Sequence, residues 1–220
     1  MITKKLKNDN KIKTLYKELK DKYDLSEGQW ALWCKRKKSK KDKEQIIIEA
    51  ILTQRINWKN VELSMINLKK ARADSLKDIV NIGPQKLSLL IRPSGFYQTK
   101  SYYLFHLAQF VLKNYSSVEK MQKENLKKLR EGLLTVKGVG KETADDILLY
   151  ALEKSIFVID EYTRRFVKKY KIAKDLSYDY LQNLFQKNLP QSIRVYQDFH
   201  AIIVLEGKPF ARGKVENKNI

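Results

Sequence analysis

Apolar residues recur along the chain at the spacing of helices. Val61, Met65 and Leu68 form one such series, and apolar residues within 144–151 form another. Intervals of three and four residues place side chains on one face of an α-helix. Alternating strand patterns are scarce, and only four prolines and eight glycines interrupt the chain. We therefore expect a nearly all-α protein of about ten or more short helices.

The length and composition indicate a folded protein with a hydrophobic core. The 220 residues are 43% hydrophobic, which suffices for one large domain or two small ones sharing a cleft. The basic start of the chain is followed by no apolar stretch, so no secretory signal is predicted. No window of about 18 apolar residues exists, so no membrane span is predicted either.

The charge balance narrows the class of partner. Lys and Arg number 45 against 25 Asp and Glu, giving a net charge of +20. A surface with this much positive charge is expected to bind a polyanion. Nucleic acid is the first candidate, membrane lipid the second, and ribosomal or heparin-like partners follow. Residues 35–43 contain seven basic residues in nine. They could form a loop that touches DNA, but a solvated, mobile surface segment is the favoured interpretation.

Cysteine and histidine are rare. Cys34 is the only cysteine, so no internal disulfide, Cys-based zinc site or iron–sulfur cluster can form, and a cytoplasmic location is expected. His106 and His200 are the only histidines and lie far apart in sequence. We interpret them as ordinary helix residues rather than a metal pair, and we expect no metal and no cofactor.

The segment around residue 139 carries the most specific local signal. Gly138 and Gly140 flank Val139, and a helix-forming pattern follows at once. Glycine permits positive φ and close backbone approach, while free amides at a helix N-terminus bind phosphate oxygens. Lys141 adds charge, Thr143 a hydroxyl, and Val139 can pack inward. A plain tight turn between two helices is the alternative.

A second break lies in the middle of the chain. Gly83 and Pro84 interrupt the helical pattern, and the block 92–97 with Lys100 follows. A helix terminator is the favoured interpretation of this block. A second turn that works beside the glycine turn is the alternative.

Asp160 follows four apolar residues and precedes a new helical pattern, so it occupies an N-cap position. A structural cap is the simplest explanation. However, Asp160 lies twenty residues after Gly140, which leaves room for one helix between them. A carboxylate placed there could stabilise the oxocarbenium-like state of glycosidic bond cleavage and orient or activate water.

These segments together resemble a known family. The G-V-G-x-x-T-A-D turn with the later V-I-D resembles the helix-hairpin-helix plus Asp signature of the endonuclease III superfamily. Residues 51–58, I-L-T-Q-R-I-N-W, are similar to its L-T-Q-N-T helix, and R-P-S-G-F-Y at 92–97 resembles its middle region. The matches run from about residue 28 to residue 170.

The resemblance implies an all-α, two-domain fold with a DNA-binding cleft between the domains. A six-helix domain would span 36–154, and 1–35 would combine with 155–220. It also implies that Asp160 is catalytic and that Gln54 fills the gap left by a flipped base. The implied phosphate-binding residues are Gly138, Val139, Gly140, Lys141 and Thr143.

Two departures from the family pattern refine the expected activity. Bifunctional members carry a lysine two residues after the second hairpin glycine, where this chain has Glu142. Lys141 is one residue earlier, about 100° around the helix. We therefore expect a monofunctional hydrolase that leaves an abasic site. The four C-terminal cysteines that hold an iron–sulfur cluster in longer relatives are also missing.

This combination resembles the short, cluster-less 3-methyladenine DNA glycosylase branch. An alkylated purine is positively charged and already activated to leave, and aromatic rings can select it by stacking and cation–π attraction. Trp30, Trp33 and Glu142 are candidate pocket residues, and core packing is the alternative for the tryptophans. Lys208 and Phe210 are further pocket candidates.

The expected role is base excision repair by a monomer acting on damaged double-stranded DNA, with no membrane partner and, in a bacterium, association with the nucleoid. Three alternatives remain. One is a helix-hairpin-helix binding protein without catalysis. Another is a glycosylase for adenine, thymine mismatches or 8-oxoguanine. The third is a bifunctional lyase using Lys141 or another lysine.

Overall fold

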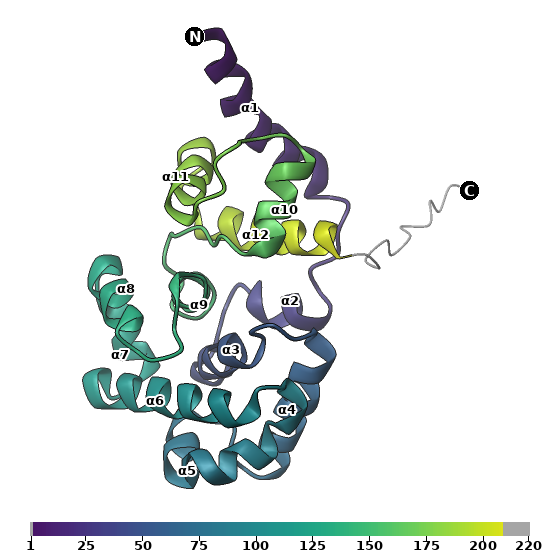
Figure 1. Ribbon diagram of the computed structural model, residues 1–220. Helices are drawn as coiled ribbons and strands as arrows, with labels where there is room; N and C mark the ends of the chain where they lie inside the picture. The colour runs from purple at the N-terminus through teal and green to yellow at the C-terminus, as the bar shows by residue number, and fades with distance from the viewer. Residues whose placement is uncertain (1, 209–220) are drawn as a thin grey trace. The chain divides into compact units, whose positions relative to one another are not determined.

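The computed structural model describes the backbone of residues 2–208 and the side chains of residues 11–208. In that range the chain forms helices joined by loops, and no strand is present (Figure 1). The expected all-α fold is therefore confirmed. Contacts divide the chain into two compact units. The hairpin unit is Lys35–Lys154, and the carboxylate unit combines the residues before Lys35 with those after Lys154.

The hairpin unit contains a run of helices that are consecutive in sequence. Its elements are α3 (Lys40–Leu52), α4 (Trp58–Lys70), α5 (Leu76–Leu90), the 3₁₀ turn η1 (Arg92–Ser94), α6 (Tyr97–Tyr115), α7 (Val118–Lys123), α8 (Leu126–Leu134), α9 (Lys141–Asp146) and the π-turn η2 (Ile147–Ala151).

The carboxylate unit combines helices from both ends of the chain. Its elements are α1 (Ile2–Leu19), α2 (Gly28–Trp33), α10 (Glu161–Lys169), α11 (Tyr178–Asn188) and α12 (Ile193–Gly207).

Helix α3 is the central helix of the hairpin unit. Its residues 46–52 are buried on every side, which is typical of a helix surrounded by others. Its buried charges have partners. Glu44 accepts a hydrogen bond from the amide of Leu76 (3.1 Å), and Lys43 donates to Gln122 (2.7 Å). These contacts fix α3 against neighbouring helices without leaving charges unsatisfied.

The basic run at 35–43 consists of an exposed loop, 35–39, and the first residues of α3. Ser39 caps α3 and forms a capping box with Asp42. Lys35 contacts Asp42 at 2.7 Å, and Lys41 contacts Asp74 at 3.1 Å. Carboxylates within the unit therefore pair with part of the run, and most of its residues are exposed, as expected for a surface segment.

The breaks in the middle of the chain separate helices, as expected. Helix α5 bends at Gly83, whose φ of 75° lies outside the helical region, and Pro84 follows. The block at 92–97 separates α5 from α6, with Gly95 at φ 62°. The helical series at 58–70 is confirmed, with Val61 and Met65 facing inward.

The core of the carboxylate unit is aromatic and lies along α12. Phe157 stacks on Phe185 at 4.6 Å between ring centroids, and Phe199 packs beside both. Phe157 belongs to a buried, extended segment that precedes α10. Two glutamines of α11 satisfy its backbone: Gln186 accepts from the amide of Phe157 (2.9 Å), and Gln182 donates to its carbonyl (2.7 Å).

Over residues 2–208, no helix is long and apolar enough to cross a membrane.

Candidate functional site

The hairpin joins α8 to α9, which lie side by side (Figure 1). Gly138 adopts φ 91°, the left-handed region in which glycine is favoured. The amide of Val139 donates to the carbonyl of Val136 (3.0 Å) and closes the turn. Val139 is buried, so it holds the turn from inside, as expected from the sequence.

The two hairpin glycines have different reasons to be glycine. A Cβ at Gly138 would lie 2.1 Å from the ring of Tyr103, which packs against the turn from α6. Gly140 has φ −90°, which any residue adopts, and a Cβ there would meet nothing within 4 Å. Gly138 is therefore required by the fold, whereas Gly140 leaves an open approach to the N-terminus of α9.

Gln54 is joined to the hairpin. Its side-chain amide donates to the carbonyl of Gly138 and to the hydroxyl of Thr143, both at 3.0 Å. Thr143 is buried, so its hydroxyl stabilises the hairpin from within rather than facing solvent. Gln54 thus connects the loop after α3 to the turn 84 residues further on.

An ion pair holds the two helices of the hairpin together. Arg130 of α8 donates to both carboxylate oxygens of Asp145 on α9, at 2.7 and 3.0 Å. Asp145 is fully buried, so this bidentate pair is screened little by solvent. After Asp146 the helix widens into the π-turn, where the amide of Leu152 bonds the carbonyl of Ile147 (3.0 Å). Such wide turns interrupt α-helices and often lie beside functional sites.

The first turn of α9 presents backbone amides that have no acceptor within the helix. The side chains of Lys141 and Glu142 are exposed there. The helix dipole adds positive potential at the same end. The arrangement can hold an anionic group such as a phosphate.

Lys100 joins the end of α3 to the end of the η1 turn. Its ammonium, only 2% exposed, donates to the carbonyls of Leu52 and Ser94, both at 2.7 Å. Burial lowers the pKa of Lys100 to about 8. Phe96, which lies between η1 and α6, adopts a left-handed φ of 46° and leaves 68% of its surface exposed. An exposed ring held on a fixed loop can contact a flat or apolar ligand group.

Asp160 caps α10, as its sequence position predicted. Its Oδ1 accepts from the amide of Thr163 (2.6 Å) and from the Thr163 hydroxyl (2.8 Å). The carboxylate keeps 13% of its side-chain surface exposed. One oxygen is therefore committed to the helix N-terminus.

The other oxygen of Asp160 faces a histidine of α12. Oδ2 lies 3.7 Å from Nε2 of His200, whose side chain is 4% exposed. Burial acts to raise the pKa of Asp160, but His200 and the hydrogen bonds from Thr163 outweigh it, so the pKa lies below its usual range. The geometry maintains a buried carboxylate in its charged form, which can stabilise a developing cation or accept a proton.

Trp30 packs on His200, the residue that faces this carboxylate. The rings of Trp30 and His200 meet edge-to-face at 6.2 Å, and Trp33 meets Trp30 edge-to-face at 6.1 Å. Both tryptophans are buried. Burial lowers the pKa of Lys208, an effect that the nearby Asp160 opposes. Phe210 lies outside the described residues.

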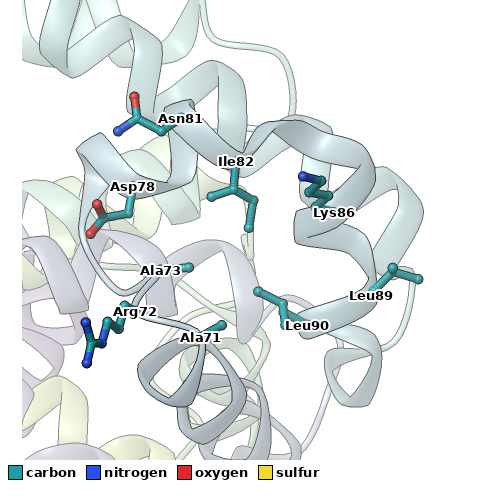
Figure 2. Close-up of a pocket in the computed structure, with 9 residues that line it drawn as sticks. All are labelled: Ala71, Arg72, Ala73, Asp78, Asn81, Ile82, Lys86, Leu89 and Leu90. Atoms are coloured by element: carbon teal, nitrogen blue, oxygen red, sulfur yellow. The ribbon is translucent and has the colours of Figure 1, made fainter.

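A hollow in the hairpin unit contains none of the expected site residues (Figure 2). It has a volume of about 510 Å³ and lies between the end of α4 and helix α5. Its lining residues are Ala71, Arg72, Ala73, Asp78, Asn81, Ile82, Lys86, Leu89 and Leu90.

Sequence reasoning missed four residues that shape these sites: Tyr103, Lys100, Arg130 and His200. Each acts through a contact with a residue more than ten positions away in the chain. Lys100 gave a weak signal as a lysine directly after the 92–97 block. The other three are ordinary helix residues by pattern, and no local signal distinguishes them.

Comparisons with known proteins identify the family. The pattern of the HhH-GPD superfamily of base excision DNA repair proteins matches residues 48–191. A protein of Methanocaldococcus jannaschii assigned to the DNA repair glycosylases is 42% identical over 173 residues, covering 77% of this chain and 79% of its own length.

Solved structures agree. The Helicobacter pylori 3-methyladenine DNA glycosylase bound to 1,N6-ethenoadenine has a TM-score of 0.74 and 33% identity, covering 87% of this chain and 94% of its own. An endonuclease III trapped as a covalent intermediate with DNA has the same fold, with a TM-score of 0.68 and 16% identity, covering 90% and 84%. The chain belongs to the HhH-GPD superfamily of base excision DNA repair proteins.

Proposed function

We propose that this protein is a monofunctional DNA glycosylase that removes alkylated purines such as 3-methyladenine from double-stranded DNA. The observation that carries the proposal is the ionised Asp160 at the start of α10, with Oδ1 bound to Thr163 and Oδ2 facing His200. In a base excision repair family, a fixed carboxylate of this kind fits hydrolysis of an N-glycosidic bond.

The proposed reaction uses water as the nucleophile. As the bond between the base nitrogen and C1′ breaks, its electron pair leaves with the base and positive charge develops on the sugar. The carboxylate of Asp160 stabilises this charge. Water then bonds to C1′ and Asp160 accepts its proton, leaving a free base and an abasic site.

DNA binding is assigned to the hairpin. The exposed amides at the start of α9, the open approach at Gly140 and the charge of Lys141 suit a backbone phosphate. The net charge of +20 supplies the attraction that does not depend on sequence. Gln54 is proposed to fill the space of the flipped base, for which it would give up its hydrogen bonds to Gly138 and Thr143.

The substrate class follows from the leaving group. An N3-alkylated adenine carries positive charge in DNA and leaves as a neutral base, so no amine nucleophile is required. Trp30 and Trp33 are proposed for the base pocket; both rings are covered in this structure, so one of them must become exposed before cation–π attraction can favour a cationic base by about 1–2 kcal/mol. The 33% identity to a 3-methyladenine DNA glycosylase supports this class. Glu142, in place of the lysine that bifunctional relatives use, supports hydrolysis without strand cleavage.

One observation favours a second candidate, a bifunctional glycosylase and lyase. Burial lowers the pKa of Lys208, and this half-buried amine near Asp160 could attack C1′ and form a Schiff base. Borohydride would reduce that intermediate to a stable protein–DNA adduct. An adduct that disappears in Lys208→Gln would favour the lyase, and its absence would favour hydrolysis.

The proposed function is tested with methylated duplex DNA and the pure protein. Released bases are identified by chromatography, and the strands are examined before and after alkali. We expect free 3-methyladenine, with strand breaks only after alkali. Failure to release any alkylated base would contradict the proposed substrate class, and breaks before alkali would contradict the monofunctional assignment.

A further inference from the structure

We propose that His200 is a positioning residue for the reaction, which holds Asp160 oriented and charged through its Nε2 edge. The inference rests on the proposed function, because it concerns the carboxylate to which that function assigns the chemistry. It goes further by assigning a role to a residue of α12 that lies forty positions after Asp160.

The position of the His200 ring is fixed by its surroundings. It meets Trp30 edge-to-face at 6.2 Å and Phe157 edge-to-face at 6.3 Å. The side chain is 4% exposed, so the imidazole cannot turn freely into solvent. Its Nε2 edge lies 3.7 Å from Oδ2 of Asp160. Three segments distant in sequence therefore combine to aim one polar edge at the carboxylate.

The two carboxylate oxygens of Asp160 have different partners. Oδ1 binds the amide and hydroxyl of Thr163 and so serves the helix. Oδ2 is the oxygen on the side of His200. An imidazole beside it restricts rotation of the carboxylate about Cβ–Cγ and favours its negative form. Electrostatic attraction between the imidazole edge and Oδ2 at this distance offsets part of the cost of burying the carboxylate.

Two of the groups that favour the charged form of Asp160 lie in or just after α12. His200 comes from the middle of α12, and Lys208 follows the end of that helix. The imidazole also packs on the uncharged rings of Trp30 and Phe157. Removing His200 leaves Lys208 near the carboxylate. The pKa of Asp160 then rises, because burial is less fully opposed.

The test compares two histidine variants that undergo the same chemical change. His200→Phe keeps an aromatic ring beside Trp30 and Phe157 but removes the polar edge. His106→Phe is the matched control, because the chain has only these two histidines and His106 packs on Tyr102 and Phe105 in the hairpin unit. His200→Gln, which retains a side-chain donor, is the second variant in case His200→Phe folds poorly.

Two readouts are measured in each protein. The first is the pH dependence of single-turnover release of 3-methyladenine, with DNA affinity measured beside it. The second is the carboxyl ¹³C titration of Asp160 in the free protein, followed by NMR. In His200→Phe we expect the acid limb of base release and the Asp160 titration to move to higher pH by about one unit. One unit is the lower end of the shift that a nearby opposite charge produces in a carboxyl group. Below both pKa values, excision then falls about tenfold, with DNA affinity unchanged.

His106→Phe should match the wild type in both readouts, and His200→Gln should fall between the wild type and His200→Phe. If His200→Phe leaves the Asp160 titration and the low-pH side of the rate profile unchanged, the role of His200 is overturned. The proposed function is unaffected by that result. A titration that moves in a protein that releases no base would support the pairing while removing the proposed function.

Discussion

The hairpin and the surroundings of Asp160 are built by different means. At the hairpin turn the contacts are steric and neutral: Gly138 fits against the ring of Tyr103, and Gln54 donates to the Gly138 carbonyl, while the Arg130–Asp145 ion pair joins the two helices behind the turn. Around Asp160 the contacts involve a charged group: one carboxylate oxygen caps a helix and the other faces His200. A site that binds an unreactive phosphate needs a rigid backbone, whereas a site that performs chemistry needs a side chain in a defined charge state.

The largest effect on stability is expected from breaking the ion pair behind the hairpin. Arg130→Met leaves the fully buried carboxylate of Asp145 without its bidentate partner, which should lower the free energy of unfolding by about 3–5 kcal/mol. Arg165→Met is the control, because its pair with Glu161 is solvent-exposed and should contribute less than about 0.5 kcal/mol. Urea denaturation of both variants measures the contrast, and equal losses would contradict it.

A difference between the two hairpin glycines follows from their surroundings. Gly138→Ala places a methyl group on the ring of Tyr103 and forces a positive φ on alanine, so a loss of roughly 2–4 kcal/mol in unfolding free energy is expected. Gly140→Ala meets neither obstacle and should change stability by less than about 1 kcal/mol. Thermal unfolding of the pair is the measurement. Similar midpoints would show that the hairpin does not depend on close packing.

The buried Lys100 gives the hairpin unit a pH dependence. Burial lowers its pKa to about 8, while the unfolded chain keeps the proton up to about 10.4. Between these values the unfolded state binds more protons, so this group makes the free energy of unfolding rise with pH, by about 2 kcal/mol from pH 8 to pH 10. The free energy of unfolding of the wild type should therefore rise relative to that of Lys100→Met over that range. A difference independent of pH would argue against the shifted pKa.

The smallest of these effects is expected at Gln54. Gln54→Ala removes two neutral hydrogen bonds to the hairpin, each contributing about 1 kcal/mol or less. If Gln54 also fills the gap of a flipped base, affinity for lesion-containing DNA should fall more than affinity for undamaged duplex. Fluorescence titration with both duplexes tests this, using the exposed Gln98 as a control position. Equal losses on the two duplexes would assign Gln54 to the hairpin alone.

The sequence predicted the features that depend on neighbours along the chain. Helical spacing around Val61, the cap at Asp160 and the left-handed glycine at 138 all follow from local rules, and the structure has all three. The all-α fold followed from the same periodicity.

Features set by distant partners could not be predicted. Nothing near His200 or Tyr103 in the sequence indicates that one faces Asp160 and the other packs on Gly138. The helical series at 144–151 did not reveal the π-turn either, because residues 147–152 are buried on every side and no change of apolar face marks the widened turn. The ion pair of Lys41 within the basic run could not be predicted either, because its partner Asp74 lies more than thirty residues further on.

The most direct test of this account separates chemistry from binding in Asp160→Asn. The amide keeps an oxygen that can cap α10 but carries no negative charge, so the fold and the hairpin should be unaffected. On one duplex with one alkylated purine, we expect single-turnover base release to fall by about 100-fold or more, while the Kd stays within about threefold. Base release at the wild-type rate would contradict the assignment of Asp160 as the catalytic carboxylate.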